Sequence, residues 1–150
     1  MKNIFIALIA ITGLAACQNA DTKATDPGKK LTQEEKDKAI KDSANFTSIQ
    51  WLDSAFQDLG KVKEGRVVEV SYRFKNAGNH PLIISDVTAG CGCTTPDKPQ
   101  APIMPGEESM IKAKFDSKGR VGENQKSVYV TANTVPMNNH TLSFRVEVTN

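Results

Sequence analysis

Residues 46–150 predict an all-β domain, an antiparallel β-sandwich of about seven strands. Three observations support this fold class. No helical repeat of apolar residues follows residue 45. Short segments alternate apolar and polar residues, and in 67–74 this puts Val68, Val70, Tyr72 and Phe74 on one face. Turn-forming sequences separate these segments. Together they are typical of an immunoglobulin-like domain.

The strands follow one another at short intervals. Two short strands open the domain, and Trp51 in the first of them is expected in the core because Ile49 and Leu52 flank it. Turns are expected at 76–81 and 105–108, and a loop at 117–124. The expected strands are 49–52, 56–60, 67–74, 82–87, 109–115, 127–132 and 141–148.

A polar segment and a short helix precede the domain, at residues 17–45. Residues 18–31 are polar and mixed in charge, so they cannot bury enough apolar surface to fold and predict a flexible tether. Thr32 and Glu35 have the spacing of a capping box, which predicts a helix from there to about Ser43. This helix has few apolar residues, so we expect it to pack only weakly on the domain.

Residues 1–16 have the layout of a signal peptide. Lys2 gives a positive start, and residues 4–11 form an apolar run too short to span a membrane. Leu14-Ala15-Ala16-Cys17 resembles the bacterial lipobox, which implies cleavage before Cys17 and acyl chains on it. Two or more chains anchor a protein stably. Gln18 takes the place of the Asp that favours inner-membrane retention in some bacteria, so we expect anchoring at the outer membrane of a Gram-negative cell envelope.

Charge and motifs exclude several function classes. The chain has 19 Lys and Arg against 17 Asp and Glu, which gives no electrostatic basis for nucleic-acid binding. Neither a G-x-S-x-G nucleophile turn nor a phosphate-binding loop occurs in the sequence. We therefore expect no catalytic residue, no cofactor and no enzymatic activity.

From about Phe56 to Val148 the chain resembles an uncharacterised lipoprotein domain family with a Cys-Gly-Cys-Thr signature. The signature stands here at residues 91–94. Other matching segments are 72–78, 81–84, 102–107, 115–122 and 126–133. The resemblance implies a fold similar to the immunoglobulin-like domains of Hydin and of bacterial periplasmic chaperones. It also implies a secreted or lipid-anchored protein, and it brings no agreed activity.

Once Cys17 carries lipid, Cys91 and Cys93 remain as a pair in an oxidising compartment. On an extended strand their Cα atoms would lie about 6.6 Å apart, near the upper limit for a disulfide, and Gly92 lets the backbone bend. Three interpretations stay open. The pair is a local disulfide or two buried thiols, a thiol–disulfide redox site, or a soft-metal site.

The metal interpretation depends on strand direction. If the strands after Cys93 form a simple meander, the loop 133–139 lies at the same end of the sandwich as the cysteines. Met137, His140 and Met104 could then join the thiolates in binding Cu(I). His80 falls at the opposite end. We predict no metal site, and expect a lipid-anchored, non-enzymatic module that binds a protein partner in the envelope by its loops or by strand addition. The alternative is a redox or copper-handling protein that acts through Cys91 and Cys93.

Overall fold

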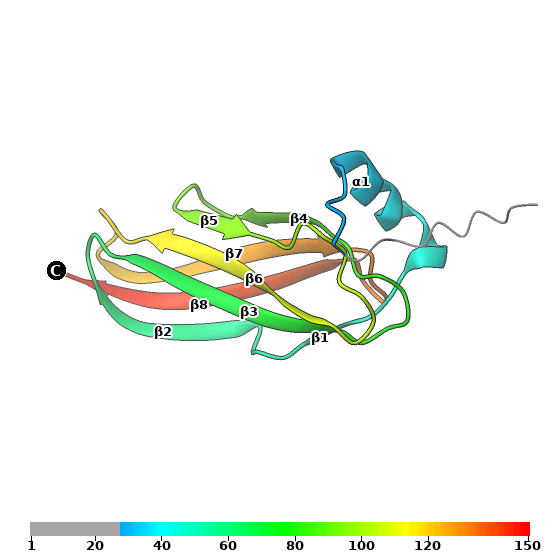
Figure 1. The fold of residues 1–150 in the computed structure, drawn as a ribbon. Helices are drawn as coiled ribbons and strands as arrows, with labels where there is room; N and C mark the ends of the chain where they lie inside the picture. The colour runs from blue at the N-terminus through cyan, green and yellow to red at the C-terminus, as the bar shows by residue number, and fades with distance from the viewer. Residues whose placement is uncertain (1–27) are drawn as a thin grey trace, which may run out of the picture.

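The computed structural model describes residues 28–150, which form two packed four-stranded sheets preceded by a short helix (Figure 1). One sheet has the order β1-β3-β6-β5 and the other β2-β8-β7-β4. The strands are β1 (Ile49–Trp51), β2 (Phe56–Lys63), β3 (Val67–Asn76), β4 (Ile84–Ala89), β5 (Thr94–Asp97), β6 (Glu108–Asp116), β7 (Gly122–Ala132) and β8 (Asn139–Thr149). The predicted immunoglobulin-like β-sandwich is confirmed, while the predicted signal peptide and Cys17 lie outside the described residues.

Two details differ from the prediction. The sandwich has eight strands, because the Thr94–Asp97 segment forms β5 along β6. This strand is short and contains Pro96, and proline is tolerated only because β5 lies at the edge of its sheet. In addition, β2 pairs with β8 in parallel, whereas the other strand pairs are antiparallel.

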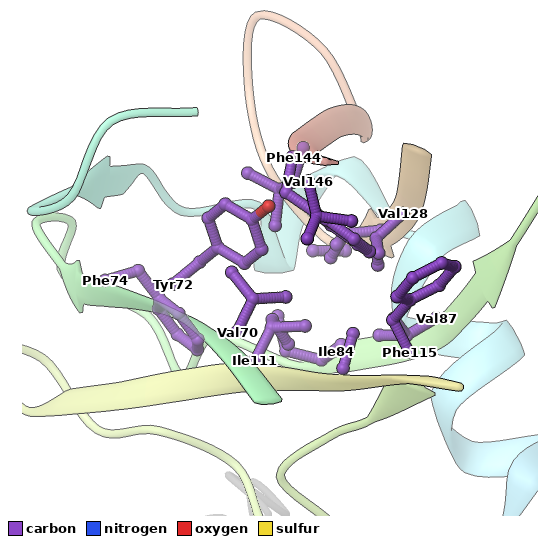
Figure 2. Packing of buried hydrophobic residues seen from close by; sticks show 14 of the residues in the cluster. Val70, Tyr72, Phe74, Ile84, Val87, Ile111, Phe115, Val128, Phe144 and Val146 are labelled. Atoms are coloured by element: carbon purple, nitrogen blue, oxygen red, sulfur yellow. The ribbon is translucent and has the colours of Figure 1, made fainter. Parts of the chain in front are cut away.

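The core lies between the two sheets and follows the predicted alternation. In β3, Val70, Tyr72 and Phe74 are buried, and Figure 2 shows Val70 and Tyr72 on the side of Phe144 and Val146 of the opposite sheet. Trp51 is partly buried at the margin of this core and meets Phe74 edge-on, with 5.5 Å between ring centroids. The sequence placed Trp51 in the core, whereas the structure places it against the edge of the core.

Two fully buried asparagines hold the loops at the end of the sandwich where β4 begins. Asn76 donates to the carbonyls of His80 and Ile103, at 2.8 and 2.9 Å. Asn133 donates to the carbonyls of Asn45 and Pro81, at 2.8 and 3.0 Å. These bonds satisfy buried and part-buried carbonyls of the loops, which lie outside the strand ladders.

The helix α1 (Gln33–Lys41) begins at Thr32, and the predicted capping box is present. It lies beside β4 (Figure 1). Lys36 is only 3% exposed and donates to the side chain of Gln100 at 3.2 Å, which ties the helix to the segment between β5 and β6. A 3-10 turn, η1 (Ser43–Asn45), then leads into the sandwich. Among residues 28–150, no helix has the length and apolar character needed to cross a membrane.

Candidate functional site

Cys91 and Cys93 form a disulfide in the segment that crosses from β4 to β5. Their Cα atoms are 5.3 Å apart, closer than on an extended strand, because the chain turns at Gly92. The N–H of Thr94 closes this turn by donating to the carbonyl of Cys91 at 3.3 Å. We call Cys91–Thr94 the disulfide turn.

The disulfide turn is half inserted into the core. Cys93 is 7% exposed and belongs to the core cluster, whereas Cys91 is partly buried and packs against it. The hydroxyl oxygen of Thr94 lies 3.7 Å from the Cys91 sulfur and 3.9 Å from that of Cys93. Because the bond closes a ring of only three residues, the chain-entropy estimate gives it about 1.6 kcal/mol, far less than a bond between distant strands.

The expectation that His140 approaches the cysteines is wrong. It assumed a simple meander, but β5 adds one reversal of direction between Cys93 and β6. As a result β7 runs away from the disulfide turn, and the loop after it lies at the other end, where β4 begins. The N–H of Gly90, next to the turn, donates to the carbonyl of Ser127 in β7. His140 pairs instead with Val130, which lies farther along β7 from the disulfide turn.

His140 has partners of its own. Its ring meets Trp51 edge-on at 5.8 Å between centroids, and its Nε2 lies 2.8 Å from the hydroxyl oxygen of Thr134. Burial lowers the pKa of His140 below its usual value. Met137 is exposed on the same loop. Within residues 28–150, no three His, Cys, Asp or Glu side chains cluster in a way that could hold a metal ion.

A second feature, which the sequence reasoning missed, is an unpaired stretch of strand edge on β3. The short β1 pairs only with the last part of β3, Phe74–Asn76. The backbone N–H of Leu52 then donates to the carbonyl of Arg73, and the N–H of Arg73 donates to the carboxylate of Asp53. Toward the start of β3, the outward carbonyl of Ser71 accepts a hydrogen bond from the side chain of Gln57.

Backbone groups of alternate residues point to the same side of a strand. The backbone N–H and C=O groups of Arg73 and Ser71 point away from β6. The backbone groups of Glu69 and Val67, two and four residues before Ser71, therefore point to that same side. Neither Val67 nor Glu69 has a hydrogen-bond partner there among the described residues, and the N–H of Ser71 has none either. We call Val67–Ser71 the open edge. One sequence signal for it was the predicted shortness of the first strand, which cannot cover a ten-residue β3.

A hollow of about 560 Å³ lies beside the open edge, between β2 and β3. Its apolar lining comes from Val62, Val67 and Val68. Its charged lining is mostly basic and consists of Lys61, Lys63, Arg66 and one acidic residue, Glu69. Both Lys61 and Glu69 make ion pairs, with Glu147 and with Lys112 respectively. The hollow thus brings together apolar side chains, free backbone groups and a basic rim.

A family model described as a protein of unknown function, DUF1573, matches residues 49–148, about two thirds of the chain. The chain belongs to the DUF1573 family. The matched region runs from β1 into β8 and contains both the disulfide turn and the open edge. The family resemblance inferred from the sequence is therefore confirmed. No curated protein matches the chain.

Solved structures share the sandwich of this DUF1573 domain. A protein of unknown function from Porphyromonas gingivalis W83 matches with a TM-score of 0.60 and 16% identity. The match covers 71% of this chain and 49% of the other, so this chain spans about half the length of that protein. The secreted serine protease VesC from Vibrio cholerae matches with a TM-score of 0.52 and 10% identity, over 68% of this chain and 23% of the protease. At these identities the similarity shows the fold alone.

Proposed function

We propose that this DUF1573 protein is a lipid-anchored envelope lipoprotein whose sandwich is a non-enzymatic module for binding or assembling proteins. The observation that carries the binding role is the open edge. Unpaired N–H and C=O groups on a strand edge are a template on which an extended segment of another protein can form a β-strand. The same groups are a liability for a protein without a partner, because they invite aggregation.

The anchoring part of the proposal rests on the sequence of residues 1–17. A basic start, an apolar run and Leu14-Ala15-Ala16-Cys17 together predict a cleaved and acylated chain. The polar residues 18–31 would then hold the domain off the outer membrane, and a flexible segment of that length reaches roughly 20 Å.

Two measurements test the proposal with the full-length protein expressed in a Gram-negative host. The Cys17→Ser variant should move from the membrane to the soluble fraction, and the intact mass of the parent should exceed that of the cleaved chain by its acyl groups. Chemical cross-linking in cells, followed by purification, should recover a stoichiometric protein partner. A chain that keeps residues 1–45 but lacks the sandwich should not recover it. A parent protein that stays soluble would overturn the anchor, and a sandwich without any specific cross-linked protein would overturn the binding module.

A thiol-redox role for Cys91 and Cys93 is the second candidate. One observation favours it: the Thr94 hydroxyl lies near both sulfurs, where it could donate a hydrogen bond to a thiolate. Against it, the turn lacks the helix N-terminus that commonly lowers a thiol pKa.

Intact mass before and after reduction and alkylation separates the two candidates. A redox site should gain two alkyl groups after mild reduction of the folded protein. The structural disulfide should gain them only with strong reductant, and reduction should then cost about 1.6 kcal/mol of unfolding free energy. The Cys91→Ala/Cys93→Ala variant, whose stability should not respond to reductant, is the control. Metal analysis of the purified protein tests the copper-handling alternative.

A further inference from the structure

The edge strands of the sandwich are protected unequally. On the side formed by β4 and β5, Pro96 lies within β5, and the ammonium group of Lys98 bonds the carbonyl of Ser85 in β4. Helix α1 adds cover beside β4 (Figure 1). Proline, lysine and a covering helix are the usual means of blocking an edge.

The side formed by β1 and β2 differs. The chain leaves the β3 sheet after Trp51 and enters the other sheet as β2, so it stops covering β3 at Arg73. The open edge that remains spans five residues, about 13 Å at the usual strand rise. The side chain of Gln57 crosses the gap between the sheets to reach Ser71 and bonds just one of its backbone groups.

The side chains that line the hollow favour some extended peptide segments over others. A strand added to the open edge would point alternate side chains inward, toward Val62 and Val68, and outward to solvent. Lys63 and Arg66 form no ion pair among residues 28–150, so their charges are available at the rim. An acidic side chain beside them would gain favourable electrostatic energy, and a basic one would be repelled.

We propose that the open edge, Val67–Ser71, accepts an extended segment of a partner protein that alternates apolar and acidic side chains. This inference rests on the proposed function and specifies its site and the chemistry of its partner. The apolar side chains of the segment lie over Val62 and Val68, and its backbone pairs with Val67 and Glu69. Its carboxylates point to solvent, where the unpaired charges of Lys63 and Arg66 attract them and the charge of Glu69 is already offset by Lys112.

The first test uses two capped nine-residue peptides as probes, one alternating glutamate with valine and one alternating lysine with valine. The ¹⁵N-labelled full-length protein is titrated with each in mild detergent. The acidic peptide should shift the amide resonances of Val67, Glu69 and Ser71 saturably, and the basic peptide should leave them unchanged at equal concentration. Equal shifts with both peptides, or shifts confined to β4 and β5, would overturn the proposal.

Two kinds of variant test the backbone edge and the basic side chains, and the first also removes the negative charge of Glu69. Glu69→Pro removes an N–H that points away from β6, so the β3–β6 ladder stays intact while the open edge is blocked. It should abolish binding of the acidic peptide. Lys63→Glu with Arg66→Glu keeps the backbone and should weaken binding at least tenfold. Lys41→Glu, a reversal of an exposed charge on α1, is the matched control and should bind like the parent. Parent-like binding by both test variants would overturn the site.

The same variants distinguish this inference from the proposed function. If cross-linking in cells recovers a specific partner from the parent and equally from Glu69→Pro and the charge-reversal variant, the binding module stands and the open edge is wrong. Light scattering tests for a second copy of the chain as the occupant. A dimer that Glu69→Pro converts to monomer, with no binding of the acidic peptide, would overturn a partner protein in favour of self-association.

Discussion

Asn133 Oδ1 accepts a hydrogen bond from the backbone N–H of Ile83 at 2.7 Å, joining two loops that are 50 residues apart in the chain. The same side chain donates to the carbonyls of Asn45 and Pro81. One fully buried amide therefore ties together the entry to the sandwich, the start of β4 and the loop after β7. None of these loop groups belongs to a strand ladder, so the side chain has no backbone substitute.

The first prediction is that Asn133→Ala lowers the free energy of unfolding by about 3 kcal/mol, because it removes three hydrogen bonds from a buried side chain to part-buried loop backbone groups. Urea denaturation measures the change. Asn79→Ala, at an exposed position in the loop after β3, is the control and should stay within about 0.5 kcal/mol of the parent. Equal effects of the two variants would show that the Asn133 bonds contribute little to stability.

The second prediction concerns Gly78, which lies against the segment that enters β1. A Cβ atom there would lie 2.1 Å from the hydroxyl oxygen of Thr47 and 2.7 Å from the backbone nitrogen of Ser48. Gly78→Ala should therefore destabilise the protein by about 2 kcal/mol or more, because the backbone must move. Gly92→Ala is the matched control, since a Cβ at Gly92 meets nothing within 4 Å, and thermal unfolding should show little change.

The third prediction concerns Tyr72, whose hydroxyl is buried in the core and has no hydrogen-bond partner among the described residues. Burial raises the pKa of Tyr72 to about 12, so the group stays neutral at ordinary pH. Removing an unsatisfied hydroxyl while keeping the ring should leave stability unchanged or raise it by up to about 1 kcal/mol. Chemical denaturation of Tyr72→Phe tests this, with the exposed Tyr129→Phe as control. A loss above about 1 kcal/mol would reveal a partner of the hydroxyl.

The fourth prediction is a dependence of stability on pH that comes from His140. Burial lowers the pKa of His140 in the folded protein, so at mildly acidic pH the unfolded chain binds the proton more readily. Stability should therefore be complete above the unfolded pKa of about 6.5 and decrease as the pH falls below it. The His140→Gln variant should show a flatter change in unfolding free energy between pH 7.5 and 5.5. A parent and variant with parallel pH profiles would contradict the burial of the neutral ring.

The sequence predicted most of the fold because its signals are local. Alternation in β3 identified its buried face, Thr32 and Glu35 identified the start of α1, and turn residues separated the strands. It did not predict β5, because a four-residue segment containing proline carries no periodic signal. That omission reversed the expected direction of the following strands and wrongly brought His140 toward the cysteines.

The sequence alone predicted a lipobox at Cys17 and pointed to the Cys91–Cys93 pair, since each depends on residues that are neighbours in the chain. Tertiary structure decided which backbone groups remain unpaired. The open edge exists because β1 ends after three residues and the chain crosses to the other sheet. Within residues 28–150, the first part of β3 therefore has no neighbouring strand on that side, and the residues of β3 themselves do not reveal this. Local chemistry determines which segments form strands, but the pairing of distant strands determines which edges are left for a partner.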